Sequence, residues 1–169
     1  MRLIPRFLVV TLTLIGCVGC DQVSKSAARA LLAAGVAESY LGDALRLQLV
    51  ENPGSFLSLG ASLPEQVRFA VFTGAVAVLL LCLVGASLFA TRLGPWRFTA
   101  LALIAGGGFS NLIDRLMNGG RVTDFLNVGI GSLRTGIFNV ADMAILAGAL
   151  LLILNLGAPA RSMPPQPRG

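Results

Sequence analysis

The chain has 169 residues, of which 55% are hydrophobic and 12% charged, and its mean hydropathy is +0.80. This composition is typical of an integral membrane protein and argues against a soluble domain. The net charge of +5 does not indicate nucleic-acid binding, because the basic residues are scattered and no basic patch is interleaved with aromatic residues. The chain contains no histidine, which excludes Ser–His and Cys–His catalysis and any metal site that relies on imidazole. We therefore expect no metal, no cofactor and no nucleic-acid partner.

The first apolar run covers residues 3–20 and begins beside Arg2 and Arg6. A secretory signal peptide has the same pattern, and Leu14-Ile15-Gly16-Cys17 resembles the lipobox at which bacterial lipoproteins are cut and lipidated. Three more apolar runs follow, so a lipid anchor would be redundant. We therefore expect an uncleaved first membrane span.

A polar stretch follows the first run. Asp21 and Lys25 are four residues apart, which places opposite charges on one helix face where the span should emerge. An interfacial ion pair and a functional pair both fit this spacing. Residues 45–49 alternate apolar and polar side chains, which indicates a strand, and the Asn-Pro-Gly content of residues 51–56 indicates a loop.

Three further apolar runs predict spans at about 67–90, 96–116 and 137–156. Each has roughly the 20 residues that cross a hydrocarbon core of about 30 Å at a rise of about 1.5 Å per residue. The third span contains Gly106-Gly107-Gly108, which would let neighbouring helices approach closely. We expect one membrane domain, residues 1–156, followed by a disordered cytoplasmic tail, residues 157–169.

Four spans place both termini on one side of the membrane. Several arginines then share that side, and the positive-inside rule makes it the cytoplasm. These arginines are Arg2, Arg6, Arg92, Arg97, Arg161 and Arg168. The loop regions 21–66 and 117–136 would face outward together, and the second contains strand-like pieces at 121–128 and 132–137.

The outward side holds a candidate pair of acids. Asn139 and Asp142 lie three residues apart at the start of the fourth span, and Asp124 lies in the loop before it. Two carboxylates held close share one proton, so one can accept a proton from water while the other donates to a scissile carbonyl oxygen. On spacing alone, proteolysis competes with a transporter or ion-binding protein that uses Asp124 and Asp142, and with a non-catalytic anchor or assembly factor.

The motifs in this order resemble the lipoprotein signal peptidases, or signal peptidase II, of bacterial inner membranes. The resemblance is carried by DQVSK at 21–25, NPGS at 52–55, GGFSNLIDR at 107–115, VTDF at 122–125 and FNVAD at 138–142. It implies an all-α membrane protein with four transmembrane helices, a small periplasmic β-cradle and a short periplasmic helix. It also implies an aspartic endopeptidase that removes the signal peptide from diacylglyceryl-modified prolipoproteins by cutting before the lipidated cysteine.

The resemblance also implies roles for individual residues. The catalytic aspartates would be Asp124 and Asp142, and Asp114 would be mainly structural. Supporting or substrate-binding positions would be Asn111, Arg115, Asn139, Asn52, Gly54, Asp21 and Lys25. The implied partners are lipid-modified prolipoproteins and membrane lipids, and we expect a monomer whose site faces the periplasm. The chain departs from the family pattern in a shorter loop between Asn52 and Phe56 and in Ser110, where glycine is usual.

Overall fold

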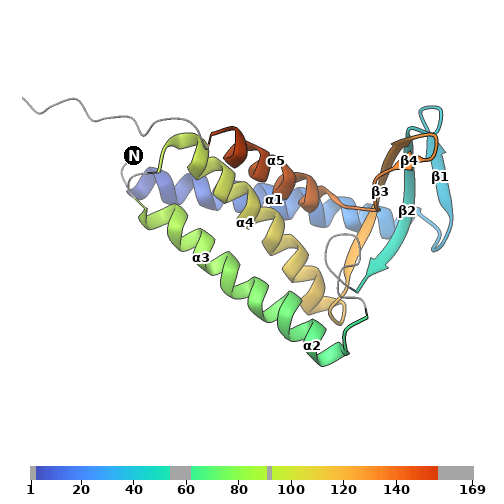
Figure 1. The fold of residues 1–169 in the computed structure, drawn as a ribbon, viewed down its shortest axis with the longest axis horizontal. Coiled ribbons are helices and arrows are strands. Elements are labelled where there is room, and N and C mark those ends of the chain that lie inside the picture. Colours follow the sequence, from blue (N-terminus) through green and yellow to red (C-terminus); the bar gives the residue numbers. More distant parts are fainter. Residues whose placement is uncertain (1–2, 54–61, 91–92, 156–169) are drawn as a thin grey trace, which may run out of the picture.

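The computed structural model describes residues 3–53, 62–90 and 93–155. Long helices lie side by side, and a four-stranded antiparallel sheet lies at one end of them (Figure 1). The helices are α1 (Leu3–Leu31), α2 (Glu65–Phe69) continuing through the π-helical segment η2 (Ala70–Ala75) into α3 (Val76–Phe89), α4 (Pro95–Met117) and α5 (Val140–Leu154). The strands are β1 (Ala37–Tyr40), β2 (Leu45–Asn52), β3 (Val122–Ile130) and β4 (Leu133–Arg134).

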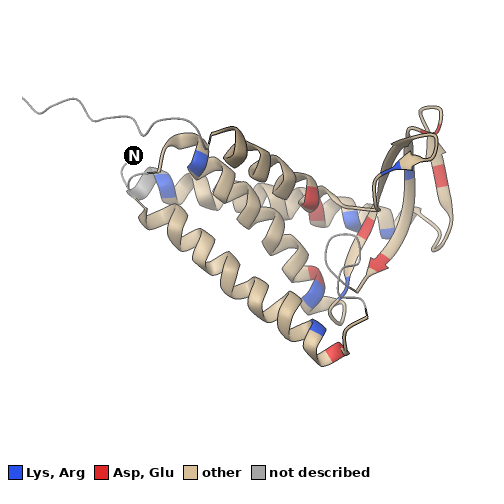
Figure 2. Cartoon of the chain, viewed as in Figure 1, with Lys and Arg blue, Asp and Glu red and all other residues tan. Residues whose placement is uncertain are grey.

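Two helical stretches, Arg6–Leu31 and Glu65–Phe89, are long and apolar enough to cross a membrane, and Val140–Leu154 is a shorter apolar helix. Large apolar side chains on these helices face outward; Leu12 is 66% exposed and Leu81 65%. Among the described residues, the charged side chains gather towards the two ends of the helices (Figure 2). Such an apolar middle with charged ends suits a hydrocarbon environment better than water.

Helix α4 lies at the centre of the bundle and contacts α1, α3 and α5. Each of its three consecutive glycines faces a different neighbour. A Cβ atom added to Gly106, Gly107 or Gly108 would lie 2.8 Å from Cys17 Cβ in α1, 2.3 Å from the Ala141 carbonyl oxygen in α5, or 2.4 Å from Leu80 Cδ2 in α3. The close helix approach predicted from the glycine triplet is therefore confirmed.

The sheet carries polar residues to the end of the bundle. Its strand order is β1-β2-β3-β4, and β2 pairs with β3 in a register that places Val50 opposite Asp124 and Asn52 opposite Val122. After β4 the chain returns to β3 through a bridge between Phe138 and Leu126, and α5 begins two residues later. Asp124, Asn52 and the start of α5 are thereby brought to one place.

The predicted strands at 45–49 and 121–128 are confirmed as β2 and β3. The loop predicted at 51–56 is wrong at its start, because Glu51 and Asn52 pair with β3 and extend β2. The strand-like piece at 132–137 forms only the two-residue β4. Strand β1 has no clear alternating pattern, and it forms because β2 supplies a paired edge.

The helices can be set beside the predicted spans, which stay predictions. Helix α1 continues past residue 20 to Leu31, and α5 begins at Val140, directly after Asn139, which the sequence placed at the start of the fourth span; Phe138 pairs with β3 and Asn139 caps the helix. Within residues 62–90, the five-residue α2 is continuous with η2 and α3, and the expected short periplasmic helix, which had no residue range, stays a prediction. Gly54 and the tail 157–169 lie outside the described residues.

Candidate active site

Asp124 on β3 and Asp142 in the first turn of α5 are joined by a single residue, Asn139. The Asn139 Nδ2 donates to Asp124 Oδ1 at 2.7 Å, and the Asn139 backbone nitrogen donates to Asp142 Oδ2 at 3.2 Å. In return, Asn139 Oδ1 accepts from the backbone nitrogen of Asp142 at 2.9 Å. These reciprocal bonds form a capping box, which starts α5 by satisfying amides that the helix leaves unpaired. The local structure that begins the helix therefore also sets the two carboxyl groups near one another.

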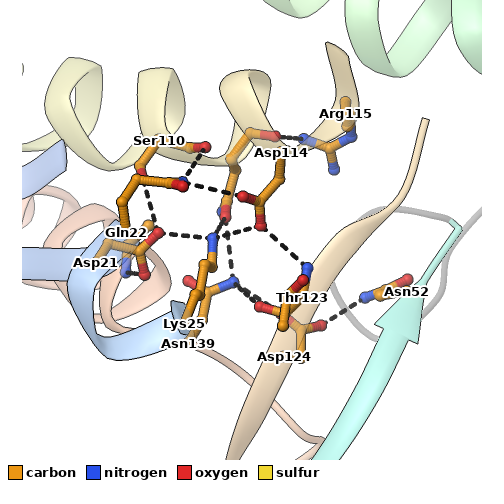
Figure 3. A network of polar contacts seen from close by, with 12 residues as sticks. Asp21, Gln22, Lys25, Asn52, Ser110, Asp114, Arg115, Thr123, Asp124 and Asn139 are labelled. Atoms are coloured by element: carbon orange, nitrogen blue, oxygen red, sulfur yellow. Dashed lines mark hydrogen bonds and ion pairs between the residues drawn. The ribbon is translucent and has the colours of Figure 1, made fainter. Parts of the chain in front are cut away.

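Two further amides complete the contacts of the acid pair. Asn52 Nδ2, at the end of β2, donates to Asp124 Oδ2 at 2.9 Å, and Asn111 Nδ2, on α4, donates to Asp142 Oδ1 at 2.9 Å. Asn139 Nδ2 also lies 3.1 Å from Asn111 Oδ1. Five residues from β2, α4, β3 and α5 thus form one connected group, all of them candidates in the sequence. Figure 3 shows Asn52 directed at Asp124 from the facing strand.

Behind the acid pair lies a buried charge cluster centred on Lys25 of α1. Its Nζ is 2.6 Å from Asp21 Oδ2, 2.8 Å from Asp114 Oδ2 and 2.9 Å from Asn111 Oδ1 (Figure 3). Lys25 and Asp21 have no exposed surface, so the pair is not the interfacial one that the sequence left open. Buried charges are tolerated when paired and hydrogen-bonded, and here they tie α1 to α4.

Three residues that complete this cluster were not predicted from the sequence to belong to the site: Gln22, Thr123 and Ser110. Ser110 was noted there only as a departure from the usual glycine. Ser110 Oγ donates to Asp21 Oδ2 at 2.7 Å, and Gln22 Nε2 donates to Ser110 Oγ at 3.0 Å and to Asp114 Oδ1 at 2.9 Å. The Thr123 backbone nitrogen donates to Asp114 Oδ2 at 3.0 Å. The available signal was the four-residue spacing of Ser110 and Asp114, which places both on one face of α4.

Of the two remaining candidates, Arg115 contacts the site and Gly54 is not described. Arg115 is buried, and its Nη1 donates to the Asn111 backbone oxygen at 3.4 Å. Its neighbour Asp114 forms its shortest ion pair with Lys25. Gly54 falls outside the described residues, so its placement is not part of the site.

The environment of Asp124 favours its protonated form. Burial, the largest cause, raises the pKa of Asp124 from 3.8 to about 6. The hydrogen bonds from Asn52 and Asn139 and the charge of Lys25 oppose this rise, whereas the nearby charge of Asp142 adds to it. A carboxyl group with such a pKa, next to a second one, can hold a proton that the pair shares at moderately acid to neutral pH.

Comparison with known sequences gives one consistent result. Residues 13–157 match the family model described as signal peptidase (SPase) II. A lipoprotein signal peptidase of Paraburkholderia phytofirmans is 41% identical over 138 residues, which cover 80% of this chain and 76% of the relative. A lipoprotein signal peptidase of Rhodococcus jostii is 33% identical over 144 residues, which cover 79% of this chain but only 65% of the relative.

The fold has a counterpart among solved structures. A protein described as a bacterial membrane enzyme superposes with a TM-score of 0.76 at 24% sequence identity, covering 88% of this chain and 87% of that one. At this identity the structural similarity supports the fold alone, whereas the sequence matches show the family. On these matches, the chain belongs to the signal peptidase II family.

Proposed function

We propose that this protein is an aspartic-type membrane endopeptidase that removes signal peptides from diacylglyceryl-modified prolipoproteins, cutting before the lipidated cysteine. The observation that carries the proposal is the double contact of Asn139, whose side chain holds Asp124 and whose backbone holds Asp142. Contact with one shared residue brings the two carboxyl groups together, as action on one peptide bond requires. The curated relatives are named for the same processing step.

In the proposed reaction, Asp124 and Asp142 share one proton. The ionised carboxylate takes a proton from a water molecule, whose oxygen attacks the scissile carbonyl carbon, while the protonated carboxyl donates to the carbonyl oxygen. Collapse of the tetrahedral intermediate breaks the C–N bond, with a proton passing to the leaving amine. The products are the signal peptide with a new carboxylate and a lipoprotein whose lipidated cysteine carries the free amine.

The roles of the remaining candidates follow from their contacts. Asn52, Asn111 and Asn139 would orient the carboxyl groups, because each donates to at least one of them. Arg115 would hold the backbone of Asn111 and place a positive charge near the acids. Gly54 and its loop would contact the substrate, as the family resemblance implies.

We further propose that α1, the stretch α2–η2–α3, α4 and α5 are four membrane spans of one domain in the bacterial inner membrane. The arginines at the end remote from the sheet would face the cytoplasm together with both termini, and the acid pair would face the periplasm. The lipid of the substrate then stays in the bilayer while its peptide bond reaches the site at the periplasmic rim. The protein would act as a monomer.

The test is cleavage of a diacylglyceryl-modified prolipoprotein by purified protein in detergent. We expect Asp124→Asn and Asp142→Asn each to lose at least about a thousandfold in rate, because each removes a proton-transfer group. Asp43→Asn is the matched control: this aspartate lies in the turn after β1, and its partners Ser39, Arg46 and Arg134 belong to the sheet.

Asp43→Asn should keep wild-type activity. Wild-type activity in either site variant would overturn the assignment of the pair, and no cleavage by the wild-type protein would favour the alternative of a transporter or ion-binding protein. That alternative is less favoured, because Asp124 and Asp142 both contact Asn139, where β3 and α5 meet, and are not spread along a path through the bundle.

A further inference from the structure

The three hydrogen bonds of Lys25 define the orientation of a neighbouring amide. An ammonium group has three hydrogens and no acceptor. Lys25 directs them to Asp21 Oδ2, Asp114 Oδ2 and Asn111 Oδ1, at 2.6, 2.8 and 2.9 Å. The Asn111 atom that faces Lys25 must therefore be the oxygen, because an amide nitrogen at this position would place its N–H donors against the N–H donors of the ammonium group.

This orientation decides what Asn111 presents to the acid pair. With its oxygen on Lys25, its NH₂ group faces Asp142 and donates to Oδ1 at 2.9 Å. Asn139 reinforces the same orientation, because its own NH₂ group lies 3.1 Å from Asn111 Oδ1. A donor aimed at a carboxylate stabilises the ionised form, and the adjacent ammonium strengthens the donor by polarising the amide.

The two acids differ in the rest of their surroundings. Asp142 also accepts from the backbone of Asn139 and lies in the first turn of α5, where the helix dipole favours an anion. Asp124 lies on a strand, 3% exposed, and its donor Asn139 Nδ2 also faces Asn111 Oδ1 and the Thr123 backbone oxygen. The two hydrogens of Asn139 Nδ2 are thus offered to three acceptors, and Asp124 has one further donor, Asn52 Nδ2, at 2.9 Å.

We propose that Lys25 is a positioning residue which, by fixing the amide of Asn111, keeps Asp142 ionised and places the shared proton on Asp124. This inference rests on the proposed function and extends it, because it assigns Asp142 as the base that activates water and Asp124 as the acid. The charged groups around the pair and its cluster are Asp21, Lys25 and Arg29 from α1, Glu51 from β2, Asp114 and Arg115 from α4, and the two acids themselves from β3 and α5. Of these, Lys25 contacts the oxygen of an amide whose nitrogen contacts Asp142.

The experiment compares two variants that both lose the Asp21–Lys25 ion pair. Asp21→Asn keeps Lys25, its pair with Asp114 and hence the orientation of Asn111. Asp21→Asn/Lys25→Gln replaces Lys25 by a neutral amide that can donate or accept, so Lys25 no longer fixes Asn111 and only Asn139 still favours its orientation. The double variant removes one positive and one negative charge together, which guards against the unfolding that an unpaired buried charge causes.

The first readout is the infrared carbonyl-stretch band of protonated carboxyl groups, measured in detergent without substrate near pH 6, the pKa of Asp124. In the Asp21→Asn protein, adding Asp124→Asn should remove the band. Adding Asp142→Asn should leave it, because burial and not Asp142 is the larger cause of that pKa. With Lys25→Gln present, the proton should spread over both acids, so the band should survive Asp124→Asn. A band that depends on Asp142 in the Asp21→Asn protein, or one that is indifferent to Lys25→Gln, would overturn the proposal.

The second readout is the pH profile of prolipoprotein cleavage. Lys25→Gln should move the acid limb of kcat upward by about one pH unit relative to Asp21→Asn, with KM unchanged, since an ionised Asp142 becomes harder to form. A purely structural role for Lys25 would lower the amount of folded protein without moving this limb, and that result would contradict the proposal. Because the infrared measurement needs no substrate, an inactive protein with the expected band would refute the proposed function and the catalytic roles, and leave standing the placement of the proton on Asp124 by Lys25.

Discussion

Asn139 performs three tasks at the scale of a single residue. Its side-chain oxygen caps α5, its side-chain nitrogen holds Asp124 and its backbone nitrogen holds Asp142. Because the oxygen is committed to a backbone N–H, the NH₂ group has to face Asp124. The residue that starts a helix thus also positions both acids, which explains why the pair lies at a helix start and not along a span.

The raised pKa of Asp124 has a consequence for stability. Between 3.8 and about 6 the folded protein binds this proton more tightly than the unfolded chain does, so raising the pH through this window favours unfolding. The stabilisation is fully present below 3.8 and is lost once the pH exceeds about 6. We expect the wild-type protein to lose on the order of 3 kcal/mol relative to Asp124→Asn across this window.

Thermal unfolding of both proteins in detergent at a series of pH values measures this difference. The gap in Tm should open between these two pH values and stay constant above the upper one. A gap in Tm that does not change with pH, or one that favours the wild type as the pH rises, would show that the pKa of Asp124 is not raised in the folded protein.

At the scale of elements, the glycines of α4 set how close the acids come. Gly107 faces the carbonyl oxygen of Ala141, the residue before Asp142, at a distance that leaves no room for a Cβ atom. The obstacle is backbone, so Gly107→Ala has to push α5 away and move Asp142 with it. A displacement of about 1 Å can cost roughly a hundredfold in rate.

We therefore expect Gly107→Ala to lose about a hundredfold in cleavage rate. Gly108→Ala meets the side chain of Leu80, which can move, so its loss should be much smaller. Gly85→Ala is the control, because nothing lies within 4 Å of the added atom. Cleavage assays of the three proteins, matched for folded amount, decide this, and equal rates for the Gly107 and Gly85 variants would refute the role of α4 in spacing the acids.

The sequence predicted those parts of the fold that depend on nearby residues. The spacing of Asp21 and Lys25 indicated a shared helix face, and the glycine triplet indicated close packing; both are seen. It could not show that Lys25 would also contact Asp114 and Asn111, because those contacts join residues more than 80 positions apart. The sequence left an interfacial pair and a functional pair both open, and in the structure the pair is buried at the centre of a network.

Ser110 shows the same limit in the site. From the sequence it was only a departure from the usual glycine. In the structure its hydroxyl donates to Asp21 and accepts from Gln22, so the added polar group is satisfied on both sides. The sequence placed Asn139 at the start of the fourth span, but it could not show that Phe138, just before it, pairs with β3.

At the scale of the whole molecule, the two ends of the bundle have different chemistry. Near the end remote from the sheet, Arg6 donates to the carbonyl oxygen of Ala90 at 2.9 Å and lies over the ring of Phe98, and Arg97 donates to Asn155 at 3.1 Å. These arginines satisfy carbonyl groups that helix ends leave unpaired. At the other end, α1 supplies Lys25 to the acid site. One helix therefore links the two ends, and the acid site is built where helices and sheet meet.

The account depends on Asp124 and Asp142 acting as one unit, and the most direct test is the single-turnover rate of prolipoprotein cleavage by Asp124→Asn, Asp142→Asn and the double variant. When two residues act as one unit, removing either of them already abolishes the contribution of the pair to the rate. The three cleavage rates should therefore be equally low. Losses that multiply in the double variant, or a single variant that cleaves at the wild-type rate, would contradict the account.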